Sequence, residues 1–353
     1  MELSYYAAFI FVSFFLSLLS MELKSKEISI FSMIFTMYVL VILFGLRDTT
    51  SGTDTLTYKN WYDSLSNGIA TRDFEYLFVQ IANIVIFLGG SSSVFFSVIC
   101  LLTLLFSFLS FKGSSNLLAA SVALAVFPFF LPGSDMLANG IRNGLSIAIA
   151  TFSCVSYLNG RSGWKSLILY VAISSLIHSS SIIFLSVLLV KKFAFFHKWK
   201  LIFLTYISFV LLDYFGIFES LFTLISSSGL SYHAVDRIIA FKYQDDDILT
   251  GYAKYYFLVI TLIPYVLKKL KFNVSDIDLS FYYLILIPYA MIFSSPSSYR
   301  FSYIGYVFML CILAKALQYC SFVSQSFIYI ALTVIMVINY STNTAMKFSV
   351  SIF

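Results

Sequence analysis

The sequence predicts an all-α fold: a polytopic transmembrane helical bundle with about 10–12 membrane segments. Composition is the first observation, because 60% of the 353 residues are hydrophobic and only 11% are charged, whereas about a quarter are charged in an average soluble domain. The second is that nearly the whole chain divides into apolar runs of membrane-spanning length. No internal repeat is visible. We therefore expect residues 1–353 to form a single integral membrane domain.

The individual segments follow from the positions of the apolar runs. A helix needs roughly 20 apolar residues to cross the hydrocarbon core. The first run lacks a basic leader and a small-residue cleavage site, so we expect a retained helix. The expected segments are 3–19, 28–46, 74–88, 93–111, 115–131, 141–159, 166–190, 201–217, 253–267, 279–294, 301–319 and 324–341.

Short lysine-rich turns predict the orientation. The turns at 20–27, 191–200 and 268–271 are basic, which is typical of cytoplasmic loops. Segments 47–73 and 218–252 are then expected to be extracytoplasmic loops.

The middle of the chain allows two topologies. Twelve full crossings would place the basic turn 160–165 outside. In the alternative, residues 74–111 cross the membrane once in net terms. Residues 166–190 enter the membrane and return to the same side as a hairpin broken near His178. We favour the alternative, because it obeys the positive-inside rule and places 132–140 outside. A broken helix at membrane depth must be buried in protein or face a wet cavity.

Several classes of function are excluded by missing features. The net charge of +5 is dispersed, so no nucleic-acid surface is predicted. There is no Walker loop, HExxH, GxSxG or CxxC. We predict no metal and no cofactor. The cysteines lie in apolar stretches without ligand spacing and are interpreted as small core residues: Cys100, Cys154, Cys311 and Cys320.

Arginine marks the candidate binding site. The chain has six arginines, and the three basic turns use lysine throughout. Three arginines stand at membrane borders with polar neighbours: Arg47 in GLRDTTSGTD, Arg142 in LANGIRNGLSIAIA and Arg300 in SSPSSYRFSY. A forked guanidinium suits bidentate recognition of phosphate, so convergence of the three would form an anion site. The simpler alternative for Arg47 is that it snorkels to lipid phosphates and pairs with Asp48.

The helix expected after Asn139 carries a polar or small face. The residues at helical spacing are Asn139, Asn143, Ser146, Ala150 and Ser153. Such a face suits close helix packing or contact with water. This helix has two interpretations: a packing seam capped by a snorkelling Arg142, or a phosphate-binding site at the membrane border. We favour the second, because a charged residue near membrane depth is costly and usually has a function.

Two residues are candidate general bases. Asp54 stands where a short helix is expected to begin, four residues before Tyr58 and close in sequence to Arg47. His178, within SLIHSSSIIF, has a side chain that titrates near neutrality. A hydrogen-bonded structural histidine is the alternative for His178. We place Asp54 first, for acceptor binding or base work, and His178 second.

The order of short motifs along residues 40–310 resembles a known family. GLR, GTD with TxxY, FEYLF, IRNGLSIAIA, IHSSSIIF and YRFSY follow one another as in the EpsG-like, Wzy-type polysaccharide polymerases of bacterial membranes. This chain reads IRN and GLS where the family pattern commonly reads IRQ and GLA.

The resemblance implies a specific function at the inner membrane. Such a polymerase joins undecaprenyl-diphosphate-linked oligosaccharide repeats at the periplasmic face, with a fold similar to GT-C glycosyltransferases. Arg47, Arg142 and Arg300 would bind the diphosphate. Tyr58, Asn143 and Tyr303 would contact the glycan of an O-antigen or capsule.

The resemblance also implies partners, and two other functions remain open. Expected partners are membrane lipid, the lipid-linked oligosaccharide, and the chain-length regulator and flippase of the same pathway. A flippase or transporter of lipid-linked glycans would use the same arginines without breaking a bond. A membrane acyltransferase or ligase acting on surface polysaccharide is the third function.

Overall fold

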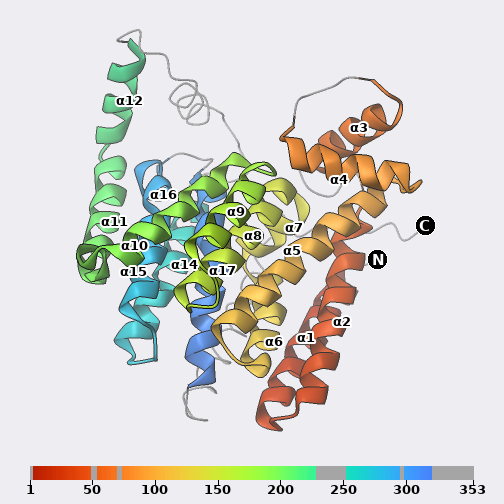
Figure 1. Cartoon of the computed structure of the whole chain (residues 1–353), viewed down its shortest axis with the longest axis horizontal. Helices are drawn as coiled ribbons and strands as arrows, with labels where there is room; N and C mark the ends of the chain where they lie inside the picture. The colour runs from red at the N-terminus through yellow and green to blue at the C-terminus, as the bar shows by residue number, and fades with distance from the viewer. Residues whose placement is uncertain (1–2, 49–53, 70–73, 228–251, 295–297, 320–353) are drawn as a thin grey trace. The chain divides into compact units, whose positions relative to one another are not determined.

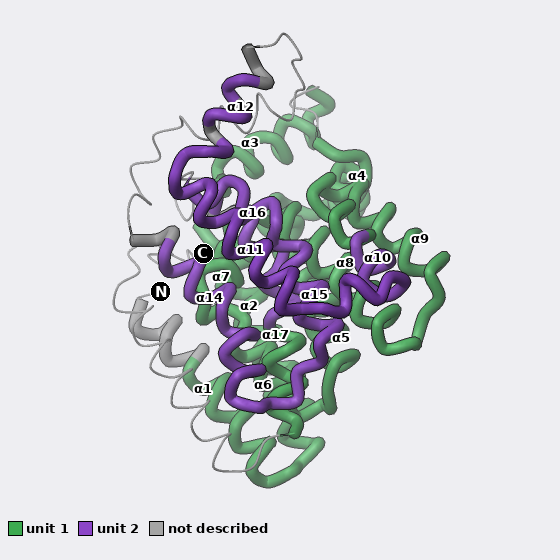
Figure 2. The backbone as a smooth tube through the Cα atoms, turned by 90° about the vertical axis from the view of Figure 1, so that its left-hand side faces the viewer, with its two compact units in different colours: residues 1–185, 310–353 green, residues 186–309 purple. Residues whose placement is uncertain are grey.

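The computed structural model describes residues 3–48, 54–69, 74–227, 252–294 and 298–319. All regular structure within these ranges is helical, which confirms the predicted fold class. The chain divides into two compact units, residues 1–185 with 310–353 and residues 186–309 (Figure 2). The expected segment 324–341, Cys320 and most of the loop 218–252 fall outside the described residues.

The first unit begins with a run of helices that matches most of the expected segments (Figure 1). Ser25 caps α2 by accepting a hydrogen bond from the Ile28 amide, and Asn116 caps α6 in the same way through the Ala119 amide. The helices are α1 (Leu3–Glu22), α2 (Lys26–Gly45), α3 (Thr55–Ser66), α4 (Tyr76–Phe87), α5 (Ser92–Ser114), α6 (Leu117–Val126), η1 (Phe127–Phe129), α7 (Leu131–Ala138), α8 (Ile141–Leu158), α9 (Trp164–Ser175) and η2 (Ser179–Ser186).

The expected segment 115–131 corresponds to a shorter helix, 117–129. This helix meets α7 at an angle of 78° around Phe130, so the two form a bent pair. Pro128 and Pro132 supply the cause, because proline has no amide hydrogen to donate and disfavours helix in the preceding residue. The helical face expected from Asn139 also starts later, since Asn139 caps α7 and α8 begins at Ile141.

The expected break near His178 is confirmed. α9 ends at Ser175 and the chain resumes as the 3₁₀ helix η2 at Ser179. Serine side chains hold the break together: Ser174 donates to Ser181 at 2.9 Å, and Ser181 donates to the His178 carbonyl at 3.1 Å.

Only some described helices satisfy the length and apolarity of a membrane span. Three do so, 26–45, 92–114 and 301–318, and the bent pair would make a fourth. Several other expected crossings are shorter helices, such as α4 with 12 residues. The cysteines within the described residues are buried thiols outside any disulfide, as expected of core residues: Cys100, Cys154 and Cys311.

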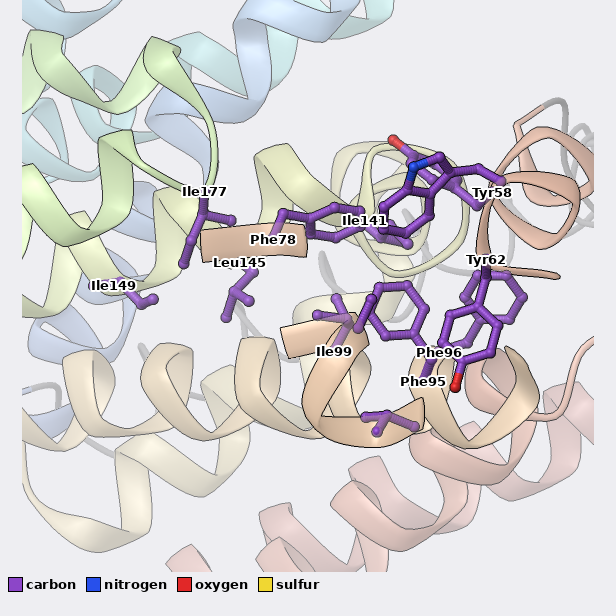
Figure 3. Packing of buried hydrophobic residues seen from close by; sticks show 13 residues of the cluster. Tyr58, Tyr62, Phe78, Phe95, Phe96, Ile99, Ile141, Leu145, Ile149 and Ile177 are labelled. Carbon is purple, nitrogen blue, oxygen red and sulfur yellow. The ribbon is translucent and has the colours of Figure 1, made fainter. Parts of the chain in front are cut away.

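The core of the first unit positions the candidate site. α5 packs on both α2 and α8, and α3 and α4 lie against one end of α5. An aromatic cluster fills that end (Figure 3). Trp61 stacks on Phe78 at 5.5 Å between ring centroids, and Tyr62 stacks on Phe95 at 5.2 Å. Aromatic pairs of this kind fix α3 against α4 and α5.

The second unit is built around buried tyrosines. Its helices are α10 (Val187–Lys192), η3 (Ala194–His197), α11 (Trp199–Tyr214), α12 (Ile217–Ser227), α14 (Tyr252–Lys269), α15 (Asp276–Ile285) and α16 (Ile287–Met291), with the start of α17 (Tyr299–Gln318). The Tyr206 hydroxyl and the Thr261 hydroxyl lie 2.7 Å apart, joining α11 to α14. Buried Asp213 accepts a hydrogen bond from the Ser294 amide at 2.5 Å, which anchors the segment after α16.

Candidate active site

The guanidinium of Arg142 is the centre of the candidate site. Arg142 is the second residue of α8, and its Nη1 forms an ion pair with the Glu75 carboxylate. Its Nε donates to the Tyr58 hydroxyl at 3.3 Å, and the guanidinium carbon lies 4.2 Å from the centre of the Phe74 ring. A carboxylate, a phenol and an aromatic face thus surround one arginine.

Local sequence explains how these partners reach Arg142. Asp54 is the N-cap of α3, as its position predicted, and the helix buries Tyr58, Trp61 and Tyr62 at helical spacing. Glu75 is the N-cap of α4 but makes no capping hydrogen bond with its side chain. The Glu75 carboxylate can therefore pair with Arg142. A charge-assisted hydrogen bond of this kind is strong between partly buried groups.

His178 joins the same cluster through α8. Its Nδ1 lies 2.8 Å from the Ser180 hydroxyl oxygen, and that hydroxyl donates to Asn143 Oδ1 at 2.7 Å. The Ser146 hydroxyl donates to the His178 carbonyl at 3.1 Å. Asn143 is the neighbour of Arg142 in the chain, so α8 carries both the arginine and the residues that orient the histidine.

The hydrogen-bond network assigns the proton on His178. The Ser180 hydroxyl has one hydrogen, which the short bond to Asn143 uses, so the 2.8 Å contact requires a hydrogen on His178 Nδ1. A 3.3 Å approach of the Ser180 amide to Nδ1 conflicts with this assignment. The two shorter contacts decide the tautomer, because hydrogen bonds weaken as the distance between donor and acceptor grows. Nε2 then carries the lone pair, as a base requires.

The break after α9 is also tied to α4. The Leu77 amide donates to the Leu176 carbonyl at 2.9 Å, two residues from both Glu75 and His178. Burial lowers the pKa of the half-buried His178 imidazole to about 4, an effect that the charge of Glu75 opposes and that of Arg142 increases. The predicted residues Tyr58, Arg142, Asn143 and His178 are therefore brought together, although they are spread over more than a hundred positions of the sequence.

Arg47 occupies a different setting nearby. It is 4% exposed, which contradicts the snorkelling alternative. Its Nε donates to the Thr55 hydroxyl at 2.9 Å, and its Nη1 donates to the Phe44 carbonyl and, at 3.3 Å, to the Leu137 carbonyl. The guanidinium carbon lies 4.5 Å from the Phe96 ring centre. Arg47 thereby joins the end of α2, the start of α3 and the end of α7.

The buried guanidinium of Arg47 remains a cation. Burial lowers the pKa of Arg47 to about 10, still well above neutral. Its Nη2 finds no acceptor within the described part of the chain. Thr55 follows Asp54 directly and Tyr58 interacts electrostatically with Arg47, so the first turn of α3 connects the Arg47 junction with the Arg142 cluster.

The remaining predicted residues belong to the second unit. Tyr303 is buried in α17 with 1% exposure, and Arg300 lies in the first turn of the same helix with its side chain outside the described ones. Convergence of all three arginines stays a prediction. Across the described residues, no three His, Cys, Asp or Glu side chains lie close enough together to hold a metal ion.

Sequence reasoning missed three members of the cluster. Phe74 and Glu75 stand in FEYLF, one of the motifs of the family resemblance, and Ser180 is one of three serines beside His178. The sequence signal for Glu75 is an acidic residue between aromatic residues at the start of an apolar run. A charge at such a border is costly without a partner, so a pairing cation could have been expected.

Comparison with known proteins agrees with the motif order. The model of the EpsG family matches residues 30–350. Neither the curated proteins nor the solved structures gave a match. A match over nearly the whole chain decides the classification: this protein belongs to the EpsG family.

Proposed function

We propose that this protein is a polysaccharide polymerase that transfers a growing glycan from undecaprenyl diphosphate to the next lipid-linked repeat at the outer face of the bacterial inner membrane. Membership of the EpsG family supports a role in polysaccharide biosynthesis. The observation that carries the proposal is the grouping of Arg142 with Tyr58, Glu75 and His178. An anion-binding group and a base within one cluster suit transfer from a diphosphate.

The transfer step requires a base that takes the proton of the acceptor hydroxyl and a cation that stabilises the leaving diphosphate. The acceptor hydroxyl loses its proton to Nε2 of His178 while its oxygen forms a bond to the anomeric carbon. The bond from that carbon to the diphosphate oxygen breaks, and the diphosphate leaves with the electron pair. Arg142 stabilises the negative charge that develops on the leaving group, an effect that usually dominates such catalysis.

Orientation of the base comes from α8. Asn143 accepts from Ser180, and Ser180 contacts His178 Nδ1, so the lone pair of Nε2 keeps one direction. Tyr58 and Asn143 are also the proposed glycan contacts in this unit.

Arg47, Arg300 and Tyr303 are the other residues to which we assign a role. Arg47 contributes a fixed positive charge and an Nη2 without an acceptor in the described residues. The proposed roles of Arg300 at the diphosphate and of Tyr303 at the glycan rest on the order of the sequence motifs alone. Asp54, which the sequence places first as the base, becomes the second candidate, because it lies at the N-cap of α3 beside the Arg47 junction, whereas His178 belongs to the Arg142 cluster.

Surface glycan from a deletion strain tests the proposed function. A polymerase deletion leaves lipid-linked product with one capped repeat on a gel, and re-expression restores the ladder. Complete loss of surface glycan would instead identify an exporter. Full-length chains that lack a substituent would identify an acyltransferase, and either result contradicts the proposal.

A further inference from the structure

Glu75 occupies the position on Arg142 that an anionic substrate would take. Its carboxylate pairs with Nη1 of Arg142, and the side chains of Arg142 and Glu75 are 17% and 27% exposed. In the proposed reaction, the diphosphate needs the same guanidinium. The Glu75 carboxylate and the diphosphate compete for the same N–H donors of Arg142. The resting ion pair therefore opposes substrate binding.

Arg142 would keep its place if Glu75 were displaced. The Phe74 ring lies against one face of the guanidinium at 4.2 Å, and Nε is held by the Tyr58 hydroxyl. Neither contact involves the carboxylate. Glu75 is bound more loosely, because it is the N-cap of α4 and its side chain makes no capping hydrogen bond.

His178 is a second possible partner for a displaced Glu75 carboxylate. His178 already interacts electrostatically with Glu75. The hydrogen bond from Leu77 to the Leu176 carbonyl fixes the backbone of the two segments side by side. Proton transfer to His178 creates an imidazolium, and a nearby carboxylate stabilises that charge.

From these contacts we infer that Glu75 is an exchangeable counter-ion of the site. In the resting protein it neutralises Arg142. When diphosphate binds Arg142, the Glu75 carboxylate is released toward His178 and stabilises the imidazolium formed during transfer. Glu75 is thus a positioning residue that couples occupancy of the diphosphate site to the strength of the base.

The exchange rests on the proposed function and makes an unusual prediction for Glu75→Gln. Removing the carboxylate frees Arg142, so undecaprenyl diphosphate should bind about five- to a hundredfold more tightly, the range typical of coupled ligands. Turnover should fall, because the imidazolium loses the carboxylate that stabilises it. If the ion pair were purely structural, its loss would not make binding tighter and turnover slower at the same time.

The experiment compares variants of the purified full-length chain in nanodiscs. Binding of undecaprenyl diphosphate and turnover of lipid-linked repeats are measured on the same samples. Glu75→Asp keeps the charge, so its binding should stay near that of the native protein. Asp63→Asn is the matched control, since it removes the carboxylate of the exposed Lys59–Asp63 pair on α3 and should change neither quantity.

Two results would overturn the exchange. Weaker binding together with slower turnover in Glu75→Gln would make the pair a structural contact. Unchanged binding would show that Glu75 does not compete with diphosphate. Native protein that binds no undecaprenyl diphosphate and extends no repeats would instead overturn the proposed function, and the exchange with it.

Discussion

The Arg47 junction and the Arg142 cluster use the same residue type in opposite ways. Arg47 is 4% exposed and donates to one hydroxyl and two carbonyl groups. Arg142 is more exposed, and its partners are a carboxylate, a phenol and an aromatic ring. Neutral backbone acceptors tie Arg47 to the fold, whereas Arg142 holds a partner that another anion can replace.

This difference predicts that Arg47 contributes mainly to stability and Arg142 mainly to the reaction. Removing Arg47 takes one donor away from each of three buried acceptors, which is costly inside a protein. Removing Arg142 leaves one carboxylate that is 27% exposed and can regain water. We therefore expect Arg47 variants to fail by unfolding and Arg142 variants to fail in transfer.

The largest effect is expected from the base on the Arg142 side. His178→Ala should slow polymerisation by roughly 10²- to 10⁴-fold, the range for loss of a general base. Asp54→Asn, on the Arg47 side, keeps size and most hydrogen bonding and should leave chain length near normal. Polymer length on gels measures both. Normal chains from His178→Ala and single repeats from Asp54→Asn would reverse the assignment.

Arg47→Ala should produce the largest loss of stability. Three acceptors each lose one donor at the meeting point of α2, α3 and α7, so the free energy of unfolding should fall by about 2–4 kcal/mol. Thermal unfolding in detergent measures the change. Arg142→Ala serves as the comparison, and an equal loss in both variants would remove the distinction between the two regions.

Gly144→Ala should affect both stability and transfer. A Cβ at this position would lie 2.6 Å from the Met136 carbonyl, so α8 would have to move away from α7. Overpacking of this kind costs about 1–3 kcal/mol, and the shift would carry Arg142 and Asn143 with it. Turnover per folded molecule should drop, and an unchanged value would show that the cluster tolerates movement of α8.

The smallest effect is expected from Lys59→Ala. Lys59 pairs with Asp63 on the exposed side of α3, with side chains 37% and 43% exposed. Exposed pairs four residues apart contribute about 0.3–0.5 kcal/mol. The variant should match the native protein in both unfolding temperature and polymer length. A clear loss in either would show that α3 matters beyond its buried face.

Local sequence signals predicted the helices and the break but not the contacts. The apolar runs located α2, α5 and α8 to within a few residues, and the serines around His178 accompanied a real interruption. The bend at Phe130 was missed although Pro128 and Pro132 flank it, because the apolar run continued through both prolines.

The candidate site could be predicted only in part. Arg142, Asn143 and His178 stood out as polar residues in apolar surroundings. Glu75 did not, because its importance depends on α4 meeting α8, and the two ion-pair partners are 67 positions apart. The pairing of distant segments is decided by aromatic packing such as Trp61 against Phe78, which a single sequence does not reveal.

Arg142→Lys gives the most direct test of the proposed diphosphate site. Lysine keeps the charge but loses the fork that binds a diphosphate and the flat surface that packs on Phe74. Purified variant and native protein are given the same lipid-linked repeats, and products are counted per folded molecule. We expect the variant to fold normally and to extend chains at least roughly 100-fold more slowly. A full-length ladder from folded Arg142→Lys would contradict the role of Arg142 in binding the leaving diphosphate.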